Sequence, residues 1–306
     1  MTRRATRDAP DLAGLATEAW DATAADLDLR STDELVSLMN GEDARVPDAV
    51  AAARVSIARA IDVAVDRLRA GGRLVYAGAG TSGRLAAVDA SECEATFGVP
   101  PGLVVAVVAG DGDRTTGAAQ QEAEDDREAG ALAVRGLGVG GGDVVVALSA
   151  SGRTPYACGA LEEAASAGAA TVAVVSVVGS ELGSLADHEI LLEVGPEVLA
   201  GSTRLKAGTA QKLVLNMIST IAMVRLGKTY GNLMVDVVAT NDKLRSRVRR
   251  IVAHATGATD DHVDAALAAA GGDAKVAIVV LAAAVDVDAA RARLDAADGV
   301  VRKALA

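Results

Sequence analysis

The sequence predicts an α/β fold, with a doubly wound, five-stranded parallel sheet between two layers of helices and a small helical domain after it. Three observations lead to this prediction. Short apolar runs alternate with stretches of helical periodicity, two of these runs end in loops rich in glycine, serine and threonine, and the last part of the chain is rich in alanine. Sheets of this kind bind ligands beyond the carboxyl ends of their strands. The search for chemistry therefore starts at those ends.

The first long element is a helix predicted over residues 47–71. Apolar residues recur there at helical spacing, Pro47 and Asp48 open the segment, and Gly71 and Gly72 end it. Short apolar runs typical of buried strands then follow at residues 73–77, 103–109, 144–148, 171–177 and 189–194. Helical stretches separate these runs, so we expect the strands to pair in parallel.

We divide the chain into an N-terminal helical arm (1–46), an α/β domain (47–242) and a small helical C-terminal domain (243–306). Glycine or aspartate breaks the last part into helices predicted at 243–255, 260–270, 273–284 and 286–296. This part gathers no nucleophiles, bases or metal ligands. We expect it to support packing or a dimer.

Composition excludes several classes of partner. A formal charge of -11 with only 2% aromatic residues leaves too few cations and rings to bind nucleic acid. The longest apolar run, 276–285, is shorter than the roughly 20 residues that a membrane-spanning helix needs. The start of the chain lacks the apolar stretch of a secretory signal. Cys93 and Cys158 fit no disulfide or zinc pattern, so we expect a cytoplasmic protein without a metal or a membrane partner.

A glycine-rich loop follows the first predicted strand. It reads Gly78-Ala79-Gly80-Thr81-Ser82-Gly83 and runs directly into a helical stretch. The pattern G-x-G-x-x-G between a strand and a helix is typical of dinucleotide sites, and Asp111 after the next strand could contact a ribose. A nicotinamide dinucleotide site is therefore one interpretation of this loop.

A second loop favours a different ligand. The strand predicted at 144–148 runs into Ser149-Ala150-Ser151-Gly152-Arg153-Thr154, and Pro155 suits the first turn of a helix. Short hydroxyl side chains beside free amides at a helix N-terminus suit a compact phosphate dianion, whereas a pyrophosphate needs bare glycines. Two such loops on one sheet predict one phosphomonoester held from two sides. The alternative is two ordinary serine or threonine helix caps.

These loops belong to a longer set of motifs. The set comprises GAGTSGR from Gly78, ALSASGRTPY from Ala147, GPEVLAGSTRLKAGTAQK from Gly195 and YGNLMVDVVATNDKL from Tyr230. With MNGEDARVPDAV and DASEC, they resemble the N-acetylmuramic acid 6-phosphate etherases of the sugar-isomerase (SIS) superfamily, over most of the chain. The resemblance implies a flavodoxin-like three-layer sandwich, a sugar-phosphate substrate, no cofactor, and a homodimer whose sites draw on both chains. It places phosphate contacts at Ser82, Ser149, Ser151 and Thr154, and we add Gly80, Thr81 and Gly152 as backbone donors.

The reaction of this family eliminates D-lactate from C3 of the sugar and then adds water, giving N-acetylglucosamine 6-phosphate. A base must remove the C2 proton and an acid must protonate the departing ether oxygen, so two carboxyl groups suffice. The resemblance implies Glu92 as the acid and Glu124 as the base, although the residues themselves do not assign these roles. A continuous helix would carry Glu92 about 13 Å beyond Gly83. We therefore expect either a helix break or a site shared with a partner subunit.

Further contacts are expected from charged residues between the motifs. Glu197 matches a position where related sugar-phosphate isomerases keep a carboxylate, so it is a third candidate for proton transfer or sugar contact. Cations for the phosphate or the lactyl carboxylate are sought among Lys206, Arg84, Arg153, Arg204 and Lys212. Residues 17–21 depart from the family pattern, which leaves open a substrate contact from the arm.

Two further functions stay open beside the lyase. A ketose–aldose phosphate isomerase on the same fold would use Glu197 as its base. A non-catalytic sensor would bind the sugar phosphate and regulate a partner protein. Glu92 and Glu124 favour the lyase, because a sensor has no need of them.

Overall fold

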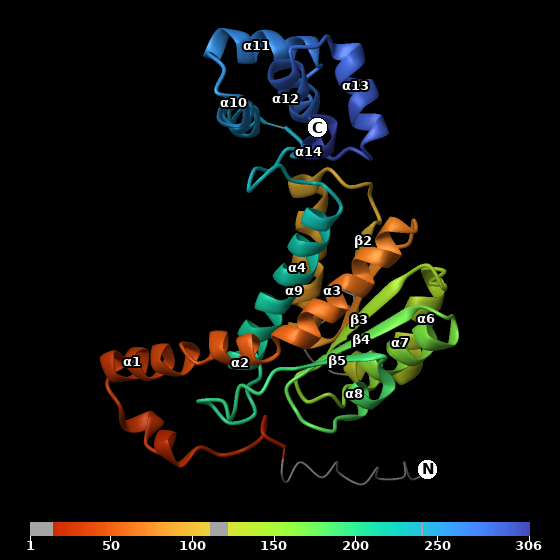
Figure 1. Ribbon diagram of the computed structural model, residues 1–306. Coiled ribbons are helices and arrows are strands. Elements are labelled where there is room, and N and C mark those ends of the chain that lie inside the picture. Colours follow the sequence, from red (N-terminus) through yellow and green to blue (C-terminus); the bar gives the residue numbers. More distant parts are fainter. Residues whose placement is uncertain (1–14, 111–121, 240) are drawn as a thin grey trace.

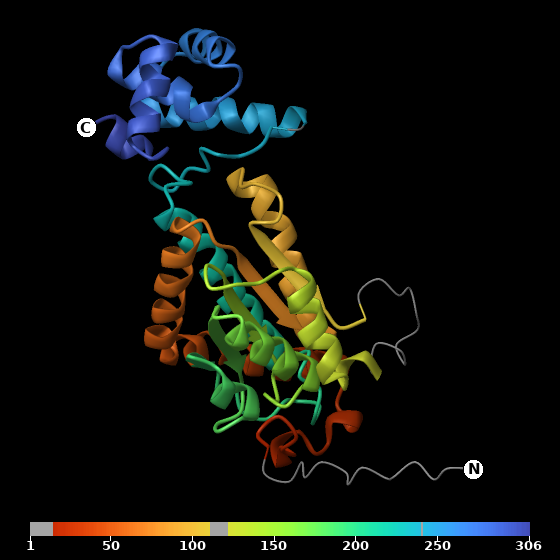
Figure 2. The ribbon, with the colours of Figure 1, turned by 90° about the vertical axis from the view of Figure 1, so that its right-hand side faces the viewer.

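We describe a computed structural model of the chain over residues 15–110, 122–239 and 241–306. An N-terminal arm, an α/β unit and a bundle of helices follow one another along the chain (Figure 1). The arm and the bundle lie at opposite ends of the α/β unit (Figures 1 and 2). The predicted site lies in the middle part.

The sheet has five parallel strands in the order β2-β1-β3-β4-β5, which confirms the predicted fold class. Its strands are β1 (Leu74–Gly78), β2 (Val104–Val108), β3 (Val144–Leu148), β4 (Ala170–Val175) and β5 (His188–Leu191). Every residue of β1, β3 and β4 is buried, because helices cover both faces and these strands read as continuous apolar runs. The chain leaves β1 for β2 on one side and continues with β3 on the other. A crevice therefore opens beyond the ends of β1 and β3.

Two layers of helices flank the sheet (Figure 1). Side chains of a strand alternate between the faces, so Leu74 and Tyr76 pack on one side and Val75 and Ala77 on the other. The first side carries α3 (Arg54–Arg69), α4 (Gly80–Phe97) and α9 (Lys206–Arg225). The second carries α6 (Arg127–Gly136), α7 (Pro155–Ser166) and α8 (Glu181–Leu185).

The loop after β1 needs its glycines for close packing. A β-carbon on Gly83 would stand 2.7 Å from the carbonyl oxygen of Gly78 and 2.7 Å from a methyl group of Val108. Only glycine lets the first turn of α4 pack this closely against β1 and β2. From there α4 runs without a break to Phe97 and ends at Gly98, whose φ of 56° is left-handed. The helix break considered for Glu92 is therefore absent.

The helix predicted over 47–71 is in fact two helices, which corrects that prediction. The first, α2 (Val46–Ala52), ends at Ala53, where ψ is 4°, and α3 begins at Arg54. The amide of Ala53 contacts the carbonyls of both Ala49 and Val50, which tightens the chain for one residue. Val50, Ala53 and Ile57 all stay buried through the break, so the apolar periodicity does not reveal it.

Helices also form the arm after residue 21 and the C-terminal region. The arm contains the short 3₁₀ turns η1 (Ala22–Ala24) and η2 (Leu27–Leu29), and then α1 (Thr32–Asp43). The C-terminal bundle consists of α10 (Asp242–Thr256), α11 (Asp260–Ala269), α12 (Ala274–Ala283), α13 (Val287–Ala296) and α14 (Val301–Ala304). The bundle encloses an apolar core of its own, with Val276, Ile278 and Val279 of α12 inside it. Among the described residues, no helix is long and apolar enough to cross a membrane.

Candidate active site

The loops after β1 and β3 meet at a cavity of about 510 Å³. Gly78 and Leu148 are paired in register, so both loops leave the sheet at the same level. Predicted site residues that line this cavity are Gly80, Thr81, Ser82, Glu124, Ser149, Ser151 and Thr154. The N-termini of α4 and α7 lie at the same edge, and the positive ends of both helix dipoles favour an anion there.

Ser149 is the centre of the second loop. Its Oγ lies 2.8 Å from Thr154 Oγ1 and 3.4 Å from Ser151 Oγ, and it accepts a hydrogen bond from the amide of Gly152 at 3.0 Å. Gly152 itself is buried, with a φ of 66°, and a β-carbon there would stand 2.3 Å from the side chain of Ser180. Thr154 precedes α7 without capping it through its side chain, so its hydroxyl remains directed at Ser149 and the cavity.

In the first loop, the hydroxyls are held by neighbouring side chains. Ser82 donates to Gln211 Oε1 at 2.8 Å, and Arg84 donates to Thr81 Oγ1 at 3.1 Å. Gln211 is buried, and its Nε2 has no hydrogen-bond partner in the described structure. Gln211 was not among the predicted site residues. An amide side chain among the small and apolar residues that α9 buries around it, Ala207, Ala210, Val214 and Leu215, is the signal that could have found it.

The carboxylate of Glu124 faces the first loop. Its Oε2 lies 3.4 Å from the position that a β-carbon on Gly80 would occupy. Burial raises the pKa of this carboxyl group, the negative charge of Asp125 raises it further, and Arg84 partly offsets both effects. A carboxyl group with a raised pKa beside a phosphate-type loop suits a proton-transfer role.

Glu92 lies elsewhere in the same chain. It is exposed on α4, twelve positions after Gly80, and an unbroken helix of that length rises about 18 Å. It does not line the cavity. Of the two explanations offered by the sequence, a break in the helix is wrong and a shared site remains.

Glu197 and Lys206 also lie outside the cavity lining. The carboxylate of buried Glu197 accepts hydrogen bonds from the amides of Lys206 at 2.9 Å and Ala207 at 3.0 Å, so it caps the start of α9. The ammonium group of Lys206 pairs with Glu42 of α1 at 2.5 Å. A direct substrate contact by either residue stays a prediction. Their observed contacts hold α9 beside the loop that ends at Arg204.

Two chain segments line the cavity beyond the predicted site residues. Residues 201–204 line it, including the expected cation Arg204 and two hydroxyls, Ser202 and Thr203. The arm lines it through Glu18, and the amide of Gly201 donates to the carbonyl of Thr17 at 3.2 Å. Of residues 17–21, where we predicted a departure from the family pattern, Glu18 therefore places an acidic side chain at the cavity wall.

The described residues do not favour a metal site or a cysteine nucleophile. Within the described ranges, no three histidine, cysteine, aspartate or glutamate side chains gather as a metal site requires. Both cysteines are free and buried, and burial is the main cause that raises the pKa of Cys93 to about 12. A thiol with so high a pKa is a poor nucleophile. Asp111, the carboxylate considered for a dinucleotide, lies outside the described residues.

Known proteins share this chain's sequence over nearly its whole length. Residues 56–165 match the family described as glucokinase regulatory protein N-terminal SIS domain, and residues 131–221 match the SIS domain. An N-acetylmuramic acid 6-phosphate etherase from Rubrobacter xylanophilus is 58% identical over 96% of this chain and 97% of its own. The chain belongs to the N-acetylmuramic acid 6-phosphate etherase family.

A second etherase supports this membership, and a solved structure supports the fold. The etherase from Streptomyces avermitilis is 55% identical over 97% of this chain and 95% of its own. A phosphoheptose isomerase structure from Francisella tularensis superposes with a TM-score of 0.51 and 22% identity, over 64% of this chain and 99% of that one. At this identity the likeness concerns the fold of the α/β unit alone.

Proposed function

We propose that this chain is an N-acetylmuramic acid 6-phosphate etherase, a lyase that releases D-lactate and N-acetylglucosamine 6-phosphate. One observation carries the proposal beyond family membership. Glu124, a half-buried carboxylate with a raised pKa, faces a cavity whose walls are the hydroxyls and helix N-termini of two phosphate-type loops. A carboxylate that can accept a proton therefore lies next to the expected phosphate site.

The phosphate is held mainly by neutral donors. The chain carries a formal charge of -11, so an anionic substrate must be attracted locally rather than by the field of the whole protein. Ser149, Ser151 and Thr154 supply hydroxyls from one loop, and Thr81 and Ser82 supply them from the other. Arg84 and Arg204 add positive charge at the cavity wall. The backbone of Gly80 also lines the cavity, whereas the amide of Gly152, predicted as a further donor, is bonded to Ser149 and supports the phosphate site through that hydroxyl.

The reaction then needs only proton transfers and electron-pair shifts. The Glu124 carboxylate takes the C2 proton of the open-chain sugar, and that electron pair forms the C2–C3 double bond as the C3–O bond breaks. Glu92 gives its proton to the ether oxygen, which releases D-lactate. Water then adds across the double bond, with hydroxyl at C3 and hydrogen at C2. Substrate plus water equals N-acetylglucosamine 6-phosphate plus D-lactate.

The position of Glu92 leads us to a homodimer. Its exposed place about 18 Å along α4 keeps it from the cavity of its own chain, so we assign it to the cavity of a second copy. In this arrangement the arm (1–46) and the α/β domain (47–242) build the cavity, and the helical C-terminal domain (243–306) supports the assembly. Two buried, unpaired cysteines fit a cytoplasmic enzyme.

The experiment is to incubate the purified protein with N-acetylmuramic acid 6-phosphate in water enriched in ¹⁸O. We expect equal amounts of D-lactate and N-acetylglucosamine 6-phosphate, with the label at the C3 hydroxyl and none in lactate. Glu124→Gln should lower the rate by about 10²–10⁴-fold while the sugar phosphate still binds. Binding without lactate release by the native protein would favour the sensor instead. Conversion of fructose 6-phosphate without lactate release would favour the isomerase.

A further inference from the structure

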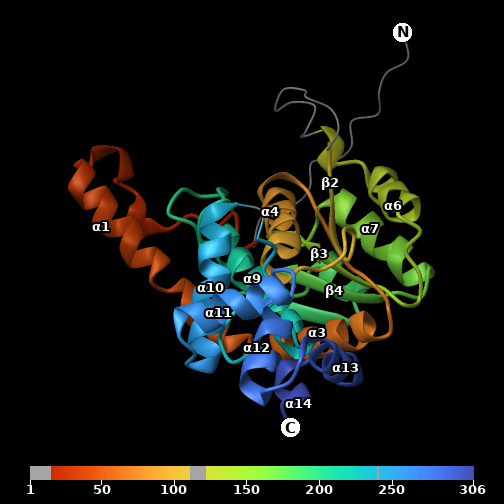
Figure 3. The same cartoon turned by 90° about the horizontal axis from the view of Figure 1, so that it is seen from above.

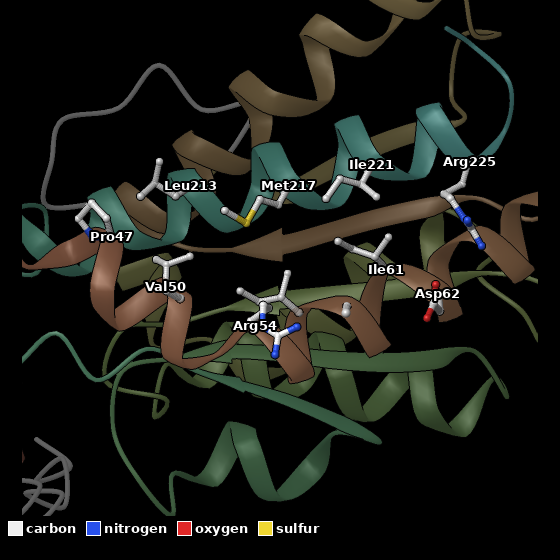
Figure 4. Close-up of a pocket in the computed structure, with 12 residues that line it drawn as sticks. Pro47, Val50, Arg54, Ile61, Asp62, Leu213, Met217, Ile221 and Arg225 are labelled. Carbon is white, nitrogen blue, oxygen red and sulfur yellow. The ribbon is translucent and has the colours of Figure 1, made fainter. Parts of the chain in front are cut away.

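A second hollow, of about 690 Å³, lies between the α2–α3 segment and α9 and shares no lining residue with the phosphate cavity. We call it the α3–α9 groove. Figure 4 shows Leu213, Met217 and Ile221 of α9 along one side of it and Val50 and Ile61 along the other. Met217 is 37% exposed and Ile221 is 40% exposed. Apolar side chains left open in a groove of this size mark a surface for another protein segment.

Helix α1 buries no apolar face against its own chain. It is twelve residues long, and none of its residues is buried. No residue of α1 belongs to an apolar cluster of the described structure, and Val36 is 62% exposed. A capping box between Ser31 and Glu34 stabilises its start, yet isolated helices shorter than about 12–15 residues are marginal in water. The helix therefore needs a surface to pack against.

The α3–α9 groove and α1 match in length and charge. From Leu213 to Arg225 α9 rises about 18 Å along the groove, and a twelve-residue helix has the same length. The sequence of α1 carries Asp33, Glu34, Glu42 and Asp43 and no lysine or arginine. Arg54 and Arg225 line the groove with one acid, Asp62, and neither arginine has an ion-pair partner among the described residues.

The α1 of the same chain cannot fill its own groove. Glu42, near the end of α1, is tied to Lys206 at the start of α9, and the groove begins only a few residues later at Pro47. From this anchor α1 projects away from the α/β unit (Figures 1 and 3). A two-fold axis near this point would place the groove of each copy beside the α1 of the other, as an isologous interface requires.

We infer that the α3–α9 groove receives helix α1 of a second copy of this chain, so that two copies exchange their α1 helices reciprocally. The inference deepens the homodimer of the proposed function and rests on that part of it alone. It gives the arm two tasks. Glu18 lines the cavity of its own chain, and α1, which follows it, holds the partner.

The test uses the full chain and measures the dimer by light scattering and sedimentation. Val36→Asp on α1 and Ile221→Asp in the groove should each raise the dimer dissociation constant, on the order of 100-fold. The matched control is Leu132→Asp, a 52% exposed leucine on α6 away from both surfaces, which should leave the dimer unchanged. Circular dichroism checks that each variant is folded. Because Val36 is exposed and outside every core, its variant keeps the test valid if Ile221→Asp misfolds.

Cross-linking identifies the occupant. A photo-reactive residue at position 36, in a mixture of ¹⁴N- and ¹⁵N-labelled chains, should give mixed-isotope cross-links to Met217 or Ile221. Cross-links within one copy, or a dimer that survives both substitutions, would overturn the inference but leave the proposed homodimer standing. A native protein that is monomeric would overturn both, and D-lactate release by that monomer would show that the reaction does not depend on them.

Discussion

The carboxylate of Glu124 faces Gly80, the first residue of α4, with its Oε2 atom 3.4 Å from where a β-carbon on Gly80 would stand. Gly80 has a φ of 53°, a backbone angle that residues other than glycine rarely adopt. The glycine thus leaves room for a carboxylate next to the amides of the phosphate loop. The carboxylate of Glu124 therefore lies beside the phosphate loop, so a substitution at Gly80 or at Glu124 should affect both proton transfer and phosphate binding.

The surroundings of Glu124 predict the pH dependence of the reaction. Burial and Asp125 raise the pKa of Glu124 above its ordinary value of 4.5, and the base must be deprotonated to act. The rate should therefore fall as the pH falls through that raised pKa. Asp125→Asn removes a negative charge and should move the acidic limb of kcat/KM to lower pH. Arg84→Met removes a positive charge and should move that limb to higher pH.

The quantity to measure is the pH at which the acidic limb of kcat/KM has its midpoint. The maximum of kcat/KM is less informative, because Arg84 also lines the cavity and its loss can weaken substrate binding. Asp126→Asn is the matched control, because Asp126 caps α6 and is not a cause of the raised pKa. Shifts of Asp125→Asn and Arg84→Met in the same direction would contradict the assignment of Glu124 as base.

The second loop predicts a loss of affinity when one hydroxyl is removed. Thr154→Val deletes the group that lies 2.8 Å from Ser149 Oγ and faces the cavity. A hydrogen bond to a charged group contributes about 1.5–3 kcal/mol, so KM should rise roughly 10- to 100-fold while kcat changes little. Thr209→Val, at an exposed hydroxyl that bonds the carbonyl of Leu205 within α9, should leave KM unchanged. A fall in kcat with normal KM would exclude a phosphate-binding role.

Substitution of Glu197 tests whether this residue holds the start of α9 or acts as the base of an isomerase. Glu197→Gln loses one of two backbone hydrogen bonds and a negative charge at the start of α9, so unfolding in urea should require about 1–3 kcal/mol less free energy. Lactate release by the folded variant should stay within a fewfold of the native rate. If Glu197 were the base, the loss of stability would be the same, but the rate of the folded variant would fall by about 10²-fold or more.

Local patterns were sufficient to predict the sheet and both loops. The strands are continuous apolar runs, and the loop residues stand directly after them, so their place follows from strand order alone. The missed contacts join positions far apart in sequence. Glu42 and Lys206 are separated by 164 residues, and Ser82 and Gln211 by 129. Periodicity carries no information about such pairs, and it also continued through the break at Ala53, because both helices bury the same stripe.

The active site that we propose is composite, with Glu124 from one copy and Glu92 from the other. It is tested by mixing the separately inactive Glu92→Gln and Glu124→Gln proteins after dissociation and reassembly, and measuring D-lactate release. Random reassembly makes half the dimers mixed, and each mixed dimer would hold one intact site, so about a quarter of native activity should return. If both glutamates of a site came from one chain, no intact site would form, and the mixture would remain as inactive as its components.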